Sequence, residues 1–288
     1  MLVLYKAIDK IFRALIKGIT SLVFMILLFI IIFLSKESMV LLKEISIMDF
    51  ILGHEWNPVG ESISLGISPM ILGTLYVSFL SIIIGLPVGV GVSIFISIIV
   101  KKSTREKIKA LIDLMAGIPS VVYGFVGLLW LVKFIEENFK IGSGECILAG
   151  GIVLSIMALP YIISTCSETM TKVFEKYSIH SRALGVSKYY MIRNLILPGS
   201  KKGILVGTLL GVSRSIGETM AVMMVIGNSP MYPSLLKKGE TIPGLIALEM
   251  SSATLGSYHY HSLYLAGLVL ILILMLINII FYFIRKFI

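Results

Sequence analysis

Six long apolar segments, separated by polar connections, set the pattern of this chain. Each has about 20 residues or more, the length that an α-helix needs to cross the hydrocarbon core of a bilayer. The segments are residues 14–34, 70–100, 111–134, 147–167, 203–227 and 262–284. The pattern therefore predicts an all-α integral membrane protein with six transmembrane helices.

The composition also indicates a membrane protein. Of the 288 residues, 57% are apolar and 14% are charged, whereas about a quarter of a soluble domain is charged. The mean hydropathy is +0.99. The first segment has full membrane length, and Ser35-Lys36-Glu37 follows it without a small-residue cleavage pattern. We therefore expect an uncleaved anchor and not a signal peptide.

Lys and Arg are concentrated in alternate connections, which predicts the orientation of the helices. The basic connections are the N-terminus, 101–109, 168–202 and the C-terminus. The connections between them are poorer in basic residues and hold a set of acidic ones, Glu37, Glu44, Asp49, Glu55, Glu61, Glu136, Glu137 and Glu145. Both termini are expected on the cytoplasmic side of the cell (cytoplasmic) membrane. The same bias explains the net charge of +9, so no nucleic-acid partner is expected.

Two charges, Arg214 and Glu218, interrupt the fifth apolar segment. A charge at the bilayer centre costs roughly 2.5–3.5 kcal/mol on insertion scales. The spacing of four residues lets both side chains meet on one helix face, and Gly203, Gly207 and Gly211 on that face allow another helix to approach closely. We expect the pair to face a helix interface. It is either a brace for packing or, as we favour, a polar gate or anion contact on a transport path.

The polar stretch 168–202 is too structured for a plain linker. Residues 178–184 are predicted as a short helix, which Gly185 ends with a turn. Ser187 can cap a second helix with an apolar stripe, and Pro198 ends that helix before the fifth segment. The sequence predicts a helix–turn–helix elbow on the cytoplasmic face. It is either an amphipathic surface helix or an element that engages a cytoplasmic partner.

The cysteines and the last two histidines are expected to have no catalytic role. Cys146 and Cys166 flank the fourth segment, and the helix between them separates them by roughly 30 Å, beyond the reach of a disulfide. His259 and His261 could share a metal ion, but no third ligand lies nearby, and we expect both to be solvated or to belong to the aromatic belt at the membrane interface. No Ser/His, paired Asp or His-Glu-x-x-His pattern lies inside the segments, so we expect neither a catalytic site nor a metal site in this chain.

Several motifs resemble the membrane subunits of ABC importers of the six-helix class. Gly185 followed by Leu195-Ile196-Leu197-Pro198 is similar to the second half of the EAA loop of that family. The family's Glu-Ala-Ala is replaced here by Ile179-His180-Ser181, and Glu175 lies one turn earlier. The stretches AGIPSVVYG (116–124), IMALP (156–160) and RSIGETMAVMMVIGN (214–228) resemble the PstC family of phosphate-importer permeases.

The resemblance implies a fold and a set of partners. The fold would be that of a type I ABC importer permease. Residues 1–69 would form an N-terminal transmembrane helix and first outer loop, and residues 70–288 a core of five helices with a coupling loop at about 168–202. The partners would be a homologous (PstA-like) permease, two ATPase (PstB-like) subunits and an extracytoplasmic phosphate-binding (PstS-like) protein. The chain has no G-x-x-x-x-G-K-[ST] motif, so ATP and Mg²⁺ would be bound by the ATPase.

The resemblance and the residues together suggest individual roles. The substrate path would include Arg214, Glu218, Ser120 and Tyr123. Coupling to the ATPase would involve Glu175, Arg182, Ala183, Gly185, Leu197 and Pro198. The substrate path would also pass the helix break at Ile118-Pro119-Ser120, because broken helices are tolerated at membrane depth where they line a cavity.

Three alternative functions stay open. An ABC permease for sulfate or molybdate would share the fold, but the Gly-Glu-Thr-Met stretch favours phosphate. An ion-coupled secondary carrier would show repeats of discontinuous helices and would not need the elbow. An intramembrane enzyme would need a catalytic pattern that the segments lack.

Overall fold

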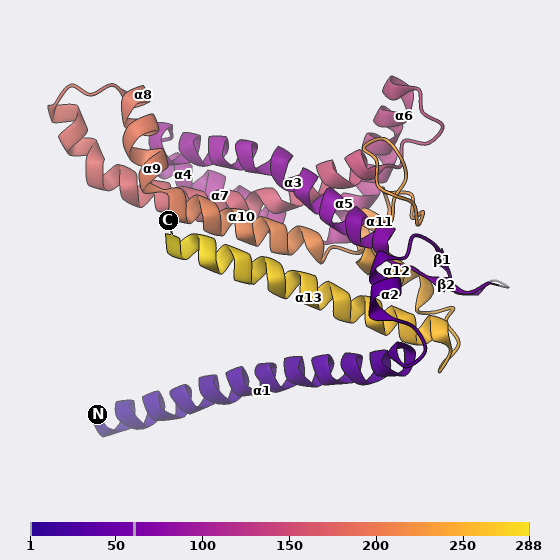
Figure 1. Cartoon of the computed structure of the whole chain (residues 1–288). Helices are drawn as coiled ribbons and strands as arrows, with labels where there is room; N and C mark the ends of the chain where they lie inside the picture. Colours follow the sequence, from indigo (N-terminus) through magenta and orange to yellow (C-terminus); the bar gives the residue numbers. More distant parts are fainter. Residues whose placement is uncertain (1, 60–61, 288) are drawn as a thin grey trace.

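A computed structural model of the chain describes residues 2–59 and 62–287, with side chains from Asp9 onward. Glu61 and the side chain of Lys6, which are part of the charge pattern, lie outside the described residues. Long helices run side by side, and both ends of the chain lie at the same end of the molecule as α8 (Figure 1).

Among the described residues, four helical segments are long and apolar enough to cross a membrane alone, and two bent pairs can each serve as one further span. The four are α1 (Leu2–Leu42), α3 (Ser68–Ile94) with the π-helical turn η1 (Phe95–Ile99), α7 (Ile147–Ala183) and α13 (Tyr258–Phe287). The first bent pair joins α4 (Lys102–Ala116) at 88° to α5 (Ser120–Val126), η2 (Gly127–Val132) and α6 (Lys133–Phe139). The second joins α8 (Lys188–Met191), η3 (Ile192–Ile196) and α9 (Leu197–Gly199) at 65° to α10 (Lys201–Ile216). This arrangement confirms the predicted all-α membrane fold.

Short elements cover the end of the bundle opposite the elbow. They are α2 (Ile47–Leu52), the antiparallel strands β1 (Trp56–Asn57) and β2 (Ser64–Leu65), α11 (Met220–Met223) and α12 (Ile242–Glu249). Trp56 pairs with Leu65 across the two strands. Ser46 caps α2 by accepting a hydrogen bond from the backbone of Met48, as expected for a serine at a helix N-terminus.

The core of the bundle is built around α7, which packs against α3 and α10. Gly203, Gly207 and Gly211 of α10 are all buried, and they face α7. A Cβ at Gly203 would lie 2.3 Å from Oγ1 of Thr169. The small-residue stripe therefore brings two helices into close contact, as the sequence predicted.

Three predicted helix boundaries are wrong. The third span begins at Lys102, within the stretch 101–109 that we assigned to a loop, and it breaks between Ala116 and Ser120. The fourth helix does not end near 167 but continues to Ala183, so the predicted short helix at 178–184 is its last turns. The fifth segment is not one helix over 203–227, because α10 ends at Ile216 and Gly217 follows it. Hydropathy marks membrane depth, but it does not show where a polar helix continues or an apolar one stops.

The N-terminal helix α1 stands apart from the core. Its contacts with the rest of the chain are mainly with α13 (Figure 1), and most of its apolar side chains are exposed. A groove of about 800 Å³ lies between α3, α10 and α13, with apolar lining that includes Leu75, Phe79, Val212 and Phe281. These apolar surfaces are available to lipid or to other subunits.

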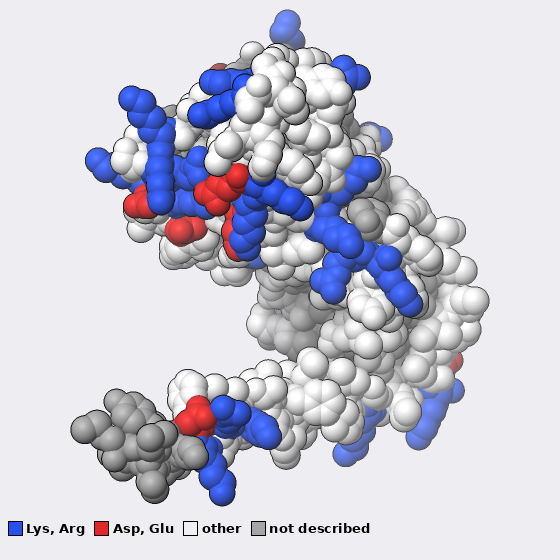
Figure 2. Space-filling model, turned by 90° about the vertical axis from the view of Figure 1, so that its left-hand side faces the viewer, with Lys and Arg blue, Asp and Glu red and all other residues white. Residues whose placement is uncertain are grey.

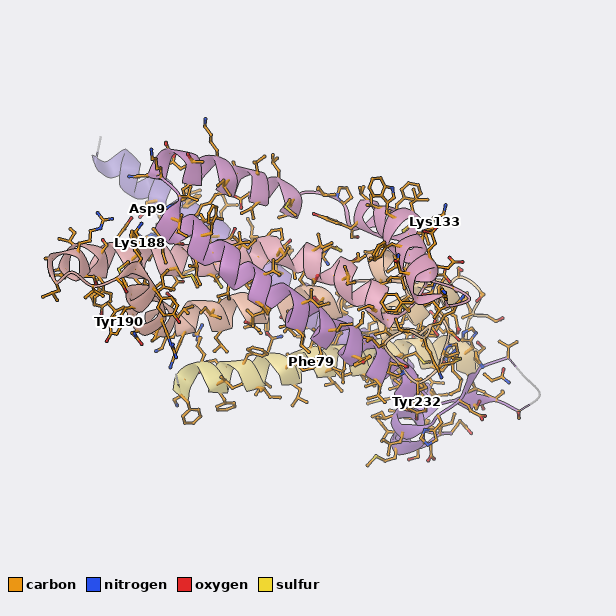
Figure 3. All side chains as sticks on the ribbon, turned by 90° about the horizontal axis from the view of Figure 1, so that it is seen from above. Asp9, Phe79, Lys133, Lys188, Tyr190 and Tyr232 are labelled. Carbon is orange, nitrogen blue, oxygen red and sulfur yellow. The ribbon has the colours of Figure 1, made fainter. Side chains whose placement is uncertain are left out.

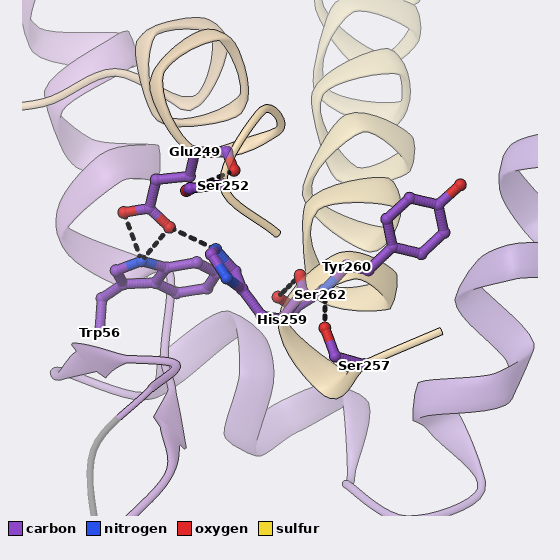
Figure 4. Close-up of polar contacts among 7 residues, drawn as sticks. All are labelled: Trp56, Glu249, Ser252, Ser257, His259, Tyr260 and Ser262. Carbon is purple, nitrogen blue, oxygen red and sulfur yellow. Dashed lines mark hydrogen bonds and ion pairs between the residues drawn. The ribbon is translucent and has the colours of Figure 1, made fainter. Parts of the chain in front are cut away.

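The two cysteines lie as the sequence predicted, whereas the last two of the four histidines do not. Cys146 and Cys166 are free and buried, as predicted. His259 and His261 are not solvated but buried near the start of α13. His259 bonds Glu249 of α12 at 2.7 Å, and the same carboxylate accepts from Nε1 of Trp56 at 3.0 Å (Figure 4). His261 lies 3.2 Å from Glu37 of α1. The histidines therefore tie α13 to its neighbours.

Glu240, just before α12, is a buried carboxyl that makes no hydrogen bond or ion pair through its side chain to any described residue. Gly73 of α3 lies so close that a Cβ there would meet the backbone oxygen of Glu240 at 2.1 Å. Burial raises the pKa of Glu240 from 4.5 to about 7, with a further contribution from Glu249. The folded protein therefore holds this proton at a higher pH than the unfolded chain does.

Because the folded state binds the extra proton, stability contributed by Glu240 is present below about pH 4.5 and is lost as the pH rises towards about 7. Glu240→Gln is expected to stabilise the protein at pH 8, by at most on the order of 3 kcal/mol, and to have little effect at pH 4.5. Melting temperatures in detergent at the two pH values check this. Glu44→Gln, at an exposed position, is the control, and a stabilisation of equal size at both pH values would contradict the prediction.

Candidate functional site

The ion pair between Arg214 and Glu218 forms, but at the end of a helix and not along one. Arg214 is in the last turn of α10, and Glu218 follows Gly217, the residue that caps this helix. Nη1 of Arg214 donates to Oε2 of Glu218. The Glu218 side chain is 4% exposed, whereas that of Arg214 is 34% exposed. Arg214 is therefore the member of the pair that an anion can reach.

Glu218 also holds the next piece of backbone. Its Oε1 accepts a hydrogen bond from the backbone nitrogen of Ala221, in the first turn of α11, at 3.2 Å. A carboxylate that accepts from backbone N–H groups at the start of a helix is favourably placed. Glu218 thus neutralises the cation of α10 and anchors the turn that leads to α11.

The helix break in the third span lies against this turn. Gly124 of α5 packs on α11, where a Cβ would lie 2.8 Å from Cα of Ala221. Ser120 is the first residue of α5, and Tyr123 donates from its hydroxyl to the backbone oxygen of Met115 at 2.9 Å, which links both sides of the break. Ser120 and Tyr123 make no direct hydrogen bond to Arg214 or Glu218 within the described part of the chain. Ser120 and Tyr123 therefore lie on the helix that packs against α11, next to the turn that holds Glu218, without a hydrogen bond to the ion pair.

Sequence reasoning missed a polar contact between α4 and α7. Asp113 of α4 accepts a hydrogen bond from Ser164 of α7 at 3.3 Å. A signal was present, because Asp113 is a charge inside the predicted third segment, 111–134. An ionisable residue within a membrane segment is a candidate functional residue by default.

The predicted elbow forms at the opposite end of the bundle. Gly185 has φ +66°, and the backbone nitrogen of Val186 bonds back to Ser181 at 2.9 Å. Ser187 then caps α8 by accepting from the backbone nitrogen of Tyr190 at 3.3 Å. The second arm ends at Gly199, one residue after Pro198. The turn and the cap are where the sequence placed them.

The second arm folds back on α7 and leaves its tip free. Met191 and Ile196 are buried, and Gly199 packs against Val173. Glu175, Arg182, Ala183, Gly185 and Pro198 are exposed, whereas Leu197 is half-buried. Ile179, Leu184 and Tyr189 expose large apolar side chains around the turn. Figure 3 shows Lys188 and Tyr190 at this end of the molecule and Lys133 and Tyr232 at the other. The tip therefore offers a mixed apolar and charged surface for a partner.

Known proteins match most of the chain. Residues 82–288 match the family described as "Binding-protein-dependent transport system inner membrane component". The "Probable ABC transporter permease protein YqgH" of Bacillus subtilis (strain 168) is 36% identical over 232 residues, which are 80% of this chain and 75% of that protein. A "Phosphate transport system permease protein PstC" of Xylella fastidiosa (strain Temecula1 / ATCC 700964) is 34% identical over 246 residues, 78% of this chain and 75% of that protein.

A solved structure shares the fold. It is described as showing inward facing conformations of the MetNI methionine ABC transporter, and it matches with a TM-score of 0.55 at 18% identity. The match covers 77% of this chain and 93% of that chain. The fold is therefore that of a type I permease. The chain belongs to the family of binding-protein-dependent transport system inner membrane components, in the group that includes the PstC phosphate transport permeases.

Proposed function

We propose that this chain is the membrane-spanning permease subunit of an ATP-driven importer that moves inorganic phosphate by alternating access. The observation that carries the proposal is the pair of the partly exposed Arg214 and the buried Glu218 at the break between α10 and α11. The relatives named as phosphate transport permeases support phosphate as the substrate. The division into an N-terminal part, 1–69, and a permease core, 70–288, is part of this proposal.

Arg214 is suited to contact phosphate on its way through the protein. A guanidinium group offers a planar fork of donors that fits phosphate oxygens and keeps its charge at all relevant pH values. Glu218 holds this fork when no anion is present and competes with the anion when it is. This competition keeps binding weak enough for release, which a conducting site requires. Ser120 and Tyr123, on the helix that packs against α11, would line the same passage.

The elbow would receive the energy of ATP hydrolysis. Its exposed tip residues offer an apolar contact surface, and its second arm is packed on α7, which runs through the core. A push on the tip would therefore move α7 and α10 together. We propose two ATPase subunits as the cytoplasmic partners, with Glu175, Arg182, Ala183, Gly185, Leu197 and Pro198 at or beside the contact.

The other partners would be a second permease and a phosphate-binding protein. The exposed apolar faces of α1 and the groove between α3, α10 and α13 leave room for the helices of a homologous permease. The short elements at the end opposite the elbow would meet the binding protein. Figure 2, which views the molecule from the elbow end, shows Lys and Arg gathered over this face. This distribution supports a cytoplasmic location for the elbow and both termini.

Phosphate uptake into membrane vesicles that contain the assembled transporter tests the function. We expect uptake that requires ATP on the elbow side and the binding protein on the other, with little competition from sulfate or molybdate. ATP-independent uptake would indicate a secondary carrier. ATP-driven uptake of sulfate in place of phosphate would assign the chain to another oxyanion.

The orientation has a separate test. In a background of Cys146→Ala with Cys166→Ala, a cysteine in place of Lys107 or Arg182 is expected to react with an impermeant thiol reagent from the cytoplasmic side alone. A cysteine in place of Val59, an exposed residue beside β1, is expected to react from outside alone. Reaction of the Arg182 position from outside would invert the proposed topology.

A further inference from the structure

A polar seam runs along the contact between α4 and α7, on the elbow side of the helix break. Asp113 and Ser164 form its inner contact at 3.3 Å. One turn nearer the elbow, Glu168 of α7 attracts Lys109 of α4 and pairs with Lys172 at 2.7 Å. Neighbouring residues of the seam are four positions apart on each helix, so each set lies along one helix face. The sets are Lys109 and Asp113 on α4, and Ser164, Glu168 and Lys172 on α7.

This seam lies at membrane depth, on a side of α4 and α7 that the rest of the described chain leaves largely exposed. Ser164 is near the middle of the 37-residue helix α7, and Asp113 is about 16 Å along α4 from its first residue. Figures 1 and 3 show α4 alongside α7, and the two helices are in contact. Ionisable side chains at such depth almost always face a bundle interior or a water-filled cavity, because exposure to lipid is costly. The seam is therefore a candidate wall of an aqueous passage.

The seam continues the proposed phosphate path. Tyr123 lies on α5 across the break, and α5 contacts α7, on which Tyr161 lies one turn of helix before Ser164. The polar line thus runs from the break, where α5 meets α11, along α7 towards the elbow. The exposed apolar residues of α4, Leu111 and Leu114, are on the same helix but outside this line.

Two groups in the seam retain binding capacity. Lys109 makes no ion pair within 4.0 Å among the described residues, and Asp113 is exposed and accepts one hydrogen bond. An ionised carboxylate has room for further donors. Near neutral pH, phosphate retains at least one P–OH group, which can donate, whereas sulfate has lost both protons. A carboxylate next to a lysine therefore distinguishes the two oxyanions.

We propose that the α4–α7 seam is an anion-binding site on the cytoplasmic part of the path, which we call the inner station. Here Lys109 attracts the anion, and Asp113 accepts a hydrogen bond from its P–OH group. The station favours protonated oxyanions such as phosphate over fully ionised ones such as sulfate. This inference rests on the phosphate-import function proposed above. The repulsion between Asp113 and the anion keeps the station weak, as a site that must release its ion requires.

Thiol labelling of the assembled transporter tests occupancy. In the cysteine-free background, Ser164→Cys is expected to react with an anionic sulfonate reagent from the elbow side. Inorganic phosphate should slow this reaction, and sulfate at equal ionic strength should not. With Asp113→Asn added, the difference between the two anions should disappear. Leu114→Cys is the control, whose labelling phosphate should leave unchanged. Inaccessibility of Ser164→Cys, or equal effects of both anions, would overturn the proposal.

Uptake measurements separate this proposal from the proposed function. Asp113→Asn is expected to lower phosphate uptake about tenfold, the order that loss of a hydrogen bond to a charged group gives. Glu106→Gln, an equal charge change at an exposed position on the same helix, should leave uptake unchanged. If the parent imports phosphate and Asp113→Asn matches Glu106→Gln, the inner station fails and the function stands. If the parent imports no phosphate, both fail.

Discussion

Replacing Arg214 and Glu218 together with glutamine is expected to leave the transporter assembled but to reduce phosphate uptake by about a hundredfold. Loss of a charged, preorganised donor to a transferring anion typically costs about 3 kcal/mol. Removing both charges leaves no uncompensated ion, so the double change should affect stability less than the loss of Arg214 alone. Uptake in vesicles with matched amounts of assembled complex measures the effect.

The single changes should differ, because the two side chains are buried to different degrees. Arg214→Gln leaves the carboxylate of Glu218, 4% exposed, without its partner, and we expect destabilisation on the order of 3 kcal/mol. Glu218→Gln leaves Arg214, 34% exposed, partly solvated, and should destabilise less. Arg214→Lys should also transport poorly, because it keeps the charge and loses the planar fork.

A matched control is available in α1. Arg13 and Asp9 form a pair with the same four-residue separation, in which both side chains are more than half exposed. Asp9→Asn with Arg13→Gln should therefore leave uptake and stability unchanged. Near-normal uptake by the double variant at Arg214 and Glu218 would reduce that pair to a structural brace. The anion contact would then be sought first around Ser120 and Tyr123.

The sequence predicted those features that depend on local chemistry. The number of spans follows from apolar length, the glycine stripe from the need of two helices to approach, and the elbow from a glycine at positive φ and a serine cap. Each is encoded within a few residues. The break at Ile118-Pro119-Ser120 is of the same kind, because proline disfavours helix in the residue that precedes it.

The features that the sequence did not predict depend on contacts or on competition between neighbouring preferences. The bond between Trp56 and Glu249 joins residues 193 positions apart, so no local pattern shows that Glu249 connects Trp56 with His259. α10 ends at Ile216, and Glu218 then accepts a hydrogen bond from the backbone of Ala221, which follows it, while apolar residues continue on both sides. The extension of α7 to Ala183 is helped by the pair of Lys172 and Glu168, which stabilises a polar helix without any hydrophobic signal.

The second large effect is expected at the turn of the elbow, where Gly185→Val should leave the protein inserted but abolish most of the stimulation of ATPase activity by loaded binding protein. Gly185 has φ +66°, and a Cβ there would meet nothing within 4 Å. The effect would therefore come from the backbone alone. A β-branched residue strains this left-handed conformation by more than about 1 kcal/mol, and the strain is relieved if the turn opens.

The choice of the substituted residue separates backbone strain from loss of contact. Asparagine tolerates the left-handed region better than other residues with a side chain, so Gly185→Asn should keep most of the stimulated ATPase activity although it adds a longer side chain than alanine. Gly185→Ala should lie between the asparagine and valine variants. If all three variants fail equally, the ATPase contacts the glycine surface itself. If Gly185→Val retains full stimulation in the assembled complex, the geometry of this turn does not transmit the energy, and the exposed tip residues Leu184 and Tyr189 become the next candidates.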